Sequence, residues 1–122
     1  MAVHHNVLGA RPKTTERVFA QIAGPEQGAR QLIAYENVLL PGTAVPLHMH
    51  AVEELLVCLS GTAECCFGGG APQTYSAGSV VIIPANTPHK IRNTGSGELR
   101  QLSFFPAVSQ DTTWLEPQGS VE

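Results

Sequence analysis

The feature that most limits the fold is the frequency of turn signals along the chain. Turns rich in Gly, Pro and Asn recur at short intervals, as in GPEQG at 24–28, GGGAP at 68–72 and PANTP at 84–88. The segments between them are short and rich in Val, Ile, Leu, Phe and Tyr, and no long window keeps an apolar period of 3.6 residues. Short apolar segments between such turns are typical of a β-sandwich or barrel. The sequence therefore predicts an all-β protein.

The turns divide the chain into a series of predicted strands. We expect strands at 16–22, 30–40, 45–50, 53–60, 62–67, 72–76, 79–83, 88–93 and 98–105. The 122 residues fit one domain, which we place over 1–122 with an N-terminal arm at 1–15, a barrel core at about 16–106 and a C-terminal tail at 107–122. We expect the tail to be irregular and its Trp114 to pack on the exterior of the barrel.

Composition excludes several classes of partner. The net charge of −3, the pI of about 5.9 and the scattered Lys and Arg give no reason to expect nucleic acid or an anionic membrane. No apolar stretch reaches the roughly 20 residues of a transmembrane helix, and the N-terminus does not resemble a signal peptide. The three cysteines include the adjacent pair Cys65 and Cys66, which indicates free thiols in a reducing compartment. We therefore expect a cytoplasmic protein.

Two of the five histidines lie in the short stretch HMHAVEE at 48–54. Residues two apart in a strand point to the same face, so His48 and His50 share a face. Even spacing keeps Glu54 on that face if the chain stays extended, whereas Glu53 points away. An unpaired carboxylate inside a sheet is costly, and a divalent metal would offset that cost. Imidazole and carboxylate ligands together suit Fe, Mn, Ni, Cu or Zn.

A fourth candidate ligand, His89, follows the turn bracketed by Pro84 and Pro88. It opens the next predicted strand and shares a face with Asn93. His4 and His5 belong to the N-terminal arm, and we do not expect them to be ligands.

At these residues the chain resembles the cupin family. The family's first motif, G-x5-H-x-H-x3-E-x6-G, is met at every position by GTAVPLHMHAVEELLVCLSG at 42–61. The second, G-x5-P-x-G-x2-H-x3-N, is met by GSVVIIPANTPHKIRN at 78–93, with Asn86 in place of the motif glycine. Asn tolerates a left-handed turn conformation better than most residues, so we expect the turn to survive.

The resemblance implies a double-stranded β-helix, a small jelly-roll barrel. It also implies one mononuclear divalent metal (Fe, Mn, Ni, Cu or Zn) held by His48, His50, Glu54 and His89. Cupins include dioxygenases, decarboxylases, isomerases, lyases and plain binding domains, and the fold does not choose among them.

Three functions are weighed. We favour a metal-dependent enzyme acting on a small oxygen-rich molecule, of oxygenase, isomerase or lyase type. The alternative is a non-catalytic module that uses the metal to bind or sense a carboxylate or sugar, and a metal-stabilised structural domain comes third.

Catalytic residues beyond the metal ligands are not assigned from the sequence. The inward-facing candidates are Tyr35, Cys58, Glu64, Tyr75, Arg100 and Gln101, each of which has an ordinary structural interpretation. The outward positions Leu55, Val57 and Leu59, together with the apolar segment SVVII at 79–83, leave more apolar surface than a small barrel exposes to water. We therefore expect a homodimer.

Overall fold

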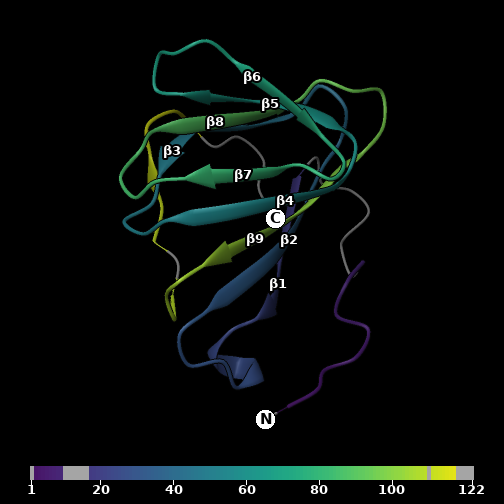
Figure 1. The fold of residues 1–122 in the computed structure, drawn as a ribbon, viewed down its shortest axis with the longest axis vertical. Helices are drawn as coiled ribbons and strands as arrows, with labels where there is room; N and C mark the ends of the chain where they lie inside the picture. Colours follow the sequence, from purple (N-terminus) through teal and green to yellow (C-terminus); the bar gives the residue numbers. More distant parts are fainter. Residues whose placement is uncertain (1, 10–16, 110, 118–122) are drawn as a thin grey trace.

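The computed structural model describes residues 2–9, 17–109 and 111–117 (Figure 1). Its elements are β1 (Arg17–Ala23), the short 3-10 helix η1 (Pro25–Gln27), β2 (Ile33–Leu39), β3 (Ala44–Met49), β4 (Glu54–Ser60), β5 (Thr62–Phe67), β6 (Gln73–Ser76), β7 (Val80–Ile83), β8 (His89–Asn93), β9 (Leu99–Phe105) and β10 (Thr113–Trp114). No helix among the described residues is long and apolar enough to cross a membrane.

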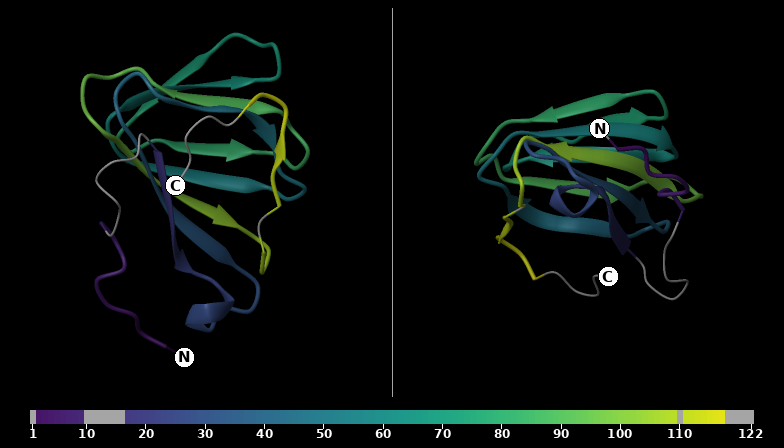
Figure 2. Two further views of the ribbon diagram at one scale, coloured as in Figure 1. Left: turned by 180° about the vertical axis from the view of Figure 1, so that it is seen from behind. Right: turned by 90° about the horizontal axis from the view of Figure 1, so that it is seen from below.

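The strands form two five-stranded sheets. One has the order β1-β2-β9-β4-β7 and the other has the order β10-β3-β8-β5-β6, and neighbouring strands in both are antiparallel. The sheets pack face to face, and the chain passes back and forth between them (Figures 1 and 2). This is the jelly-roll arrangement of a double-stranded β-helix, as expected.

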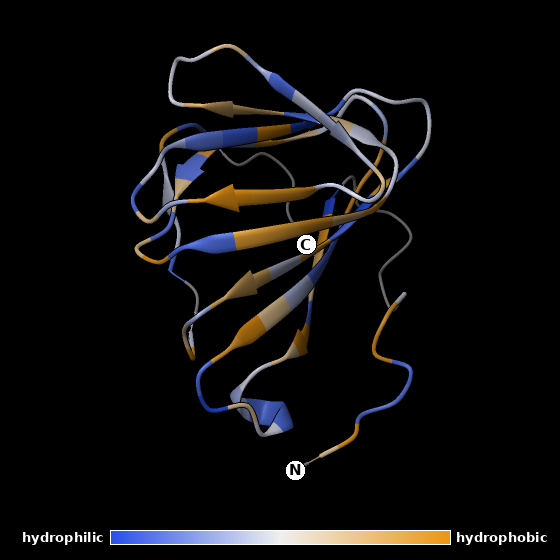
Figure 3. Cartoon of the chain, in the orientation of Figure 1, coloured by the Kyte–Doolittle hydropathy of each residue, from blue (hydrophilic) through white to orange (hydrophobic). Residues whose placement is uncertain are grey.

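Alternation of side chains along each strand separates the barrel interior from its outer faces. In β4, Leu56 and Cys58 are buried, whereas Leu55 and Leu59 are 36% and 41% exposed. The same alternation buries every second residue of β9, from Leu99 to Phe105. Hydropathy along the ribbon shows β7 apolar along its length (Figure 3).

Each of the nine predicted strands is present, with bounds that differ from the prediction by up to three residues. Residue 16, where the first was expected to begin, lies outside the described residues. The prediction for the tail was wrong. Residues 113–114 form the short strand β10 against β3, with Trp114 opposite His48.

Two of the turns with left-handed backbone conformations lie within the two motifs. Gly61, between β4 and β5, has φ of 95°, and a Cβ there would lie 2.7 Å from the carbonyl oxygen of Glu98. Asn86 has φ of 57° and occupies the motif's glycine position in the left-handed conformation expected of it. Its backbone N–H donates to the carbonyl of His50 at 2.7 Å, so this turn ties the second motif to the first.

Candidate metal centre

Four buried side chains converge inside one end of the barrel. His48, the last residue but one of β3, pairs with His89 at the start of β8. His50 follows β3, and Glu54 begins β4 in the opposite sheet. One ligand atom from each of the four lies within 4.8 Å of the other three. The structure therefore brings together all four residues that the sequence analysis selected, as a group that could hold a metal ion.

The three imidazoles are oriented by hydrogen bonds at their Nδ1 atoms. His48 Nδ1 lies 2.7 Å from the carbonyl oxygen of Pro46, and His89 Nδ1 lies 2.9 Å from that of Thr87. His50 Nδ1 lies 3.0 Å from the carbonyl oxygen of Asp111. Carbonyls only accept hydrogen bonds, so each Nδ1 carries the proton and each Nε2 keeps its lone pair. This tautomer is the one that binds metals through Nε2.

The carboxylate is ionised in this surrounding. Burial alone would raise the pKa of Glu54, but hydrogen bonds from the His50 and His89 imidazoles, made when Nε2 carries a proton, lower that pKa to about 2. Both Nε2 atoms lie 3.4 Å from Glu54 Oε1. Among the described residues, neither Glu54 Oε1 nor His89 Nε2 has a hydrogen-bond partner. A buried carboxylate that faces imidazole lone pairs is costly, and a divalent cation bound between them removes the cost.

The histidines themselves differ in basicity. Burial, followed by the nearby His89, lowers the pKa of His48 to about 4. Burial also disfavours the charged form of His50, but Glu54 and the Asp111 backbone outweigh it and raise the pKa of His50. His48 is therefore neutral near pH 7, as a metal ligand must be.

These donors fit a divalent transition metal. Three neutral imidazoles and one carboxylate leave a divalent ion with a net positive charge, and the set suits Fe, Mn, Ni, Cu or Zn. Four protein ligands also leave room for one or two further donors if the ion is five- or six-coordinate. Such a position is what a catalytic site keeps open.

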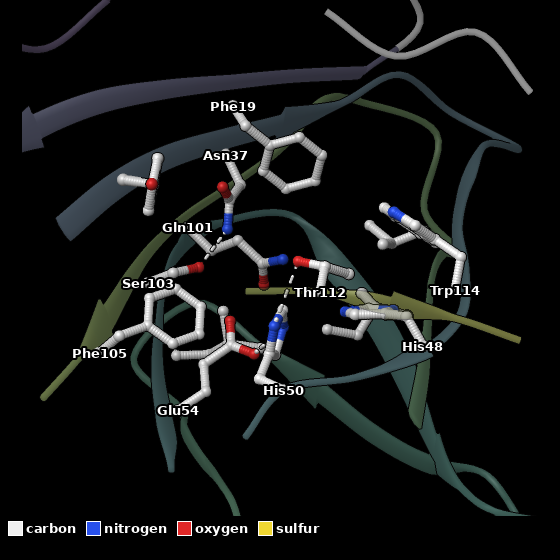
Figure 4. Close-up of a pocket in the computed structure, with 14 residues that line it drawn as sticks. Phe19, Asn37, His48, His50, Glu54, Gln101, Ser103, Phe105, Thr112 and Trp114 are labelled. Carbon is white, nitrogen blue, oxygen red and sulfur yellow. Dashed lines mark hydrogen bonds and ion pairs between the residues drawn. The ribbon is translucent and has the colours of Figure 1, made fainter. Parts of the chain in front are cut away.

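The group opens onto a cavity of about 280 Å³ (Figure 4). Besides three of the four candidate ligands, its wall is formed by Phe19, Tyr35, Asn37, Val45, Leu56, Ile91, Gln101, Ser103, Phe105, Thr112 and Trp114. The wall is largely apolar, and its polar side chains come mainly from β2 and β9. A ligand in this cavity would therefore reach both the candidate metal and a limited set of hydrogen-bonding groups.

The C-terminal segment 111–116 closes one side of this site. Its Asp111 accepts hydrogen bonds from His50 and, through Oδ1 at 3.2 Å, from the backbone N–H of Ala51. The Trp114 ring lies 5.0 Å from the His48 ring and lines the cavity, so the prediction that Trp114 packs on the exterior was wrong. Glu116 Oε1 anchors the segment by accepting from Leu47 N at 2.9 Å and from Lys90 Nζ at 3.1 Å.

Four of the other inward-facing candidates lie in the cavity wall or in the core behind it. Tyr35 and Gln101 line the cavity, and Tyr75 is buried behind it with its hydroxyl donating to Gln101 Oε1 at 2.8 Å. Cys58 is buried in the core without lining the cavity.

Glu64 and Arg100 were wrongly predicted to face inward. Glu64 lies between the buried Ala63 and Cys65, and Arg100 forms an ion pair with Glu36 on the outer face of its sheet. Arg100 and Gln101 are adjacent in one strand, so only one of them can face the interior.

Sequence reasoning did not select several residues that line the cavity. These are Phe19, Asn37, Ser103, Phe105 and Thr112. Ser103 and Phe105 lie two and four residues after Gln101 in one predicted strand, so alternation could have placed them on the same face as Gln101. Nothing local in the sequence marks Thr112, which reaches the site only because the C-terminal segment folds back.

Comparison with known proteins agrees with the fold and the motif residues. The family model for the cupin domain matches residues 36–105, which is more than half of the chain. This chain belongs to the cupin family. The matched region holds His48, His50, Glu54 and His89, and excludes the segment that carries Trp114.

Two curated relatives share part of this cupin domain. Auxin-binding protein 1 of Arabidopsis thaliana is 29% identical over 83 residues, which cover 62% of this chain and 42% of the relative. The dimethylsulfoniopropionate lyase DddQ of Ruegeria pomeroyi is 34% identical over 61 residues, or 50% of this chain and 30% of the relative. The match therefore spans less than half the length of either relative.

Among solved structures, the polyketide cyclase RemF of Streptomyces resistomycificus has the same fold along nearly the whole chain. The TM-score is 0.78, with 18% identity and coverage of 98% of this cupin and 88% of the cyclase. At that identity the likeness shows the fold alone.

Proposed function

We propose that this cupin is a metal-dependent enzyme whose small-molecule substrate binds the metal through oxygen atoms. The observation that carries the proposal is the position of the His48, His50, Glu54 and His89 group at the wall of a cavity of about 280 Å³. A purely structural metal is enclosed by its ligands, whereas this group adjoins space for a ligand of roughly ten non-hydrogen atoms.

The cavity wall favours an oxygenase among the three reaction types. Isomerases and lyases need a positioned acid or base to move a substrate proton. Apart from the candidate ligands, the described wall residues carry no carboxylate, imidazole or amine, and Tyr35 is the titratable side chain among them. When bound, an iron ion would supply redox chemistry towards O2. The protein would orient the substrate and exclude water with Phe19, Phe105 and Trp114.

A lyase is the second candidate, and one residue favours it. Tyr35 lines the cavity, and burial, with a smaller contribution from Glu26, raises the pKa of Tyr35. A phenol that stays protonated is suited to donate a proton to a leaving group rather than to remove one. The partial similarity to the lyase DddQ agrees with this alternative.

Binding without turnover is the remaining alternative, and the partial similarity to auxin-binding protein 1 agrees with it. Its ligand would use the same open positions on the metal and the same cavity. Turnover by the loaded protein separates this alternative from the two enzymatic ones.

The test is a screen with metal-loaded protein. Wild type and His50→Ala are loaded anaerobically with Fe²⁺, Mn²⁺ or Zn²⁺, and then given catechols, 1,3-diketones, 2-hydroxy acids and β-substituted carboxylates. Oxygen uptake with product formation by wild type but not by His50→Ala supports the oxygenase. Products formed without oxygen uptake would support the lyase instead, and saturable binding without products would support the binding module.

We also propose that the chain works as a homodimer through the outer face of β4 and β7. This face exposes Leu55 and Leu59 together with Val80 and Ile82, which are 55% and 61% exposed. Because β7 is an edge strand, its apolar surface would pack well against a second copy. Sedimentation of Ile82→Lys beside wild type tests this, and a monomeric wild type at micromolar concentration would contradict it.

A cytoplasmic location stays a prediction. It is supported by the thiols of Cys58, Cys65 and Cys66, all of which are free.

A further inference from the structure

A row of three buried polar side chains lies along the cavity wall beside the candidate metal centre. Asn37 on β2 is the register partner of Gln101 on β9, and Ser103 follows two residues later on the same face. The three are 3%, 1% and 2% exposed, and all line the cavity. Figure 4 shows them on the side of the cavity away from His48 and Trp114. Full burial of three polar groups is costly unless they are satisfied by hydrogen bonds.

The row is held in place from behind. Tyr75 donates to Gln101 Oε1 at 2.8 Å, and burial raises the pKa of Tyr75, so the phenol remains a donor. With its oxygen engaged, Gln101 has its amide N–H groups available to the cavity. On the side away from the cavity, Gln101 is therefore already hydrogen-bonded, so the row is held in place before a ligand binds.

The near side of the row has unused hydrogen-bonding capacity. Asn37 Nδ2 donates to Ser103 Oγ, which leaves the Ser103 hydroxyl proton free to donate. Among the described residues, Asn37 Oδ1 has no hydrogen-bond partner. Ser103 Oγ keeps a second lone pair besides its proton, and Gln101 can donate, so the row can both donate and accept, as a hydroxyl group does.

The charge of the cavity wall indicates whether the row would bind a hydroxyl or an ionised group of a ligand. The described cavity wall includes no Lys, Arg or Asp, and its one carboxylate, Glu54, belongs to the candidate metal ligands. An ionised group pressed against neutral amides and apolar rings would lose its hydration without gaining a counter-ion. An uncharged hydroxyl loses far less hydration free energy when it is buried there.

The distance from metal to row suits a small ring compound. Leu55 pairs with Phe104 in the β4–β9 register, which places Glu54 opposite Phe105, and Ser103 lies two residues before Phe105 in β9. With ordinary strand spacing and rise, the Cα atoms of Glu54 and Ser103 are roughly 8 Å apart. Phe19, Phe105 and Trp114 line the same cavity as apolar walls.

We propose that the substrate of this enzyme is a hydroxylated molecule with an apolar ring and no charge at the end away from the metal. It would bind the metal through oxygen atoms at one end, and the Asn37–Ser103–Gln101 row would recognise a hydroxyl at the other end. This inference rests on the proposed function and adds the substrate class. In it, Asn37 is a specificity-determining residue.

The test compares three ring probes that share a metal-chelating end. They are 4-methylcatechol, 4-(hydroxymethyl)catechol and 4-sulfocatechol, whose far groups are apolar, hydroxylated and anionic. The protein is loaded with Zn²⁺, which has no redox chemistry, and its metal content is measured before each titration by calorimetry. We expect wild type to bind the hydroxymethyl compound roughly 5- to 10-fold more tightly than the methyl compound, the effect of one net hydrogen bond. The sulfonate should bind most weakly.

The variants assign the preference to the row. Asn37→Leu, which keeps the side-chain size, should abolish the preference for the hydroxymethyl compound and leave the Kd of 4-methylcatechol within about 2-fold. Ser103→Ala should reduce the preference in part, and it keeps the test open if Asn37→Leu fails to fold. Gln73→Leu makes the same kind of change on the exposed face of β6 and should alter nothing.

Different failures contradict different claims. Equal affinity for the methyl and hydroxymethyl compounds, or tightest binding of the sulfonate, overturns the substrate class while the metal centre stands. A preference that survives both variants overturns the role of the row, and metal-loaded protein that binds none of the three compounds overturns the inference as a whole. Failure of wild type to take up metal would overturn the proposed function itself.

Discussion

His48 and His89 differ from His50 in how the protein orients them. The Nδ1 atoms of His48 and His89 donate to carbonyls two residues earlier in the chain, at Pro46 and Thr87. His50 instead donates to Asp111, 61 residues away. Two candidate ligands are thus oriented by residues next to them in the chain, and the third depends on docking of the C-terminal segment. The candidate centre therefore has a local part, His48 and His89, and a long-range part, His50 with the C-terminal segment that orients it.

The largest expected effect removes the anionic ligand that both parts share. Glu54→Gln should lower metal affinity by about 100-fold or more, because the neutral amide is a much weaker ligand and cannot balance the charge of the ion. Glu53→Gln is the matched control, since Glu53 is exposed and adjacent. Competition titration with a chromophoric chelator measures both. Equal loss in the two variants would contradict the assignment of Glu54.

Removing the C-terminal segment that orients His50 should have the next largest effect on metal affinity. A chain ending at residue 110 lacks the Asp111 carbonyl, the Trp114 ring and the Glu116 anchor. Its metal affinity should fall by roughly 10- to 100-fold, as is usual when a partner that orients a ligand is lost. A chain ending at residue 117 keeps all three and should bind as wild type does. Unchanged affinity in the shorter chain would show that His50 needs no remote support.

In the metal-free protein, the free energy of unfolding should depend on pH through His48. The pKa of His48 in the folded protein is about 4, below its ordinary value of 6.5, so the unfolded chain binds the proton more readily. The free energy of unfolding should therefore fall as the pH drops from 6.5 to about 4, by up to roughly 3 kcal/mol for this residue alone.

The raised pKa of His50 acts in the opposite direction and offsets part of that loss. Urea unfolding of chelator-treated protein between pH 4 and 7 measures the net change. His48→Gln should flatten the dependence, and a variant with the wild-type slope would contradict the role of His48.

The smallest expected effect concerns the turn that ties the two motifs together. Asn86 adopts a left-handed conformation and donates from its backbone to the carbonyl of His50. Asn86→Ala should cost about 1 kcal/mol because Ala is strained at positive φ, whereas Asn86→Gly should stay within about 0.5 kcal/mol of wild type. Thermal unfolding compares the two. A more stable Ala variant would mean that the turn relaxes to another conformation.

Sequence reasoning reached the local part of this site and missed the long-range part. Alternation placed His48 and His50 on one face. It selected Glu54 over Glu53 by assuming an extended chain, although Glu54 lies in the opposite sheet, and the cupin resemblance added His89. It could not find Trp114 or Asp111, because a two-residue strand has no periodicity and its docking depends on partners such as Lys90 far away in the chain. Parity also shows why Arg100 and Gln101 could not both face inward, a conflict the sequence already contained.

The nine longer strands were predictable for a related reason. Each is bounded by turn residues and has enough β-branched or aromatic side chains to show its type. The pairing of strands into two sheets comes instead from the family resemblance, since contacts between distant strands leave no local signal.

The most direct test of the account is the metal content of the purified protein. Elemental analysis of wild type and His50→Ala, each after anaerobic reconstitution and removal of free metal, addresses the central claim that the four residues hold one ion. The account predicts close to one equivalent of a divalent transition metal in wild type and a large loss in His50→Ala. No bound metal in wild type, or equal amounts in the two proteins, would contradict it.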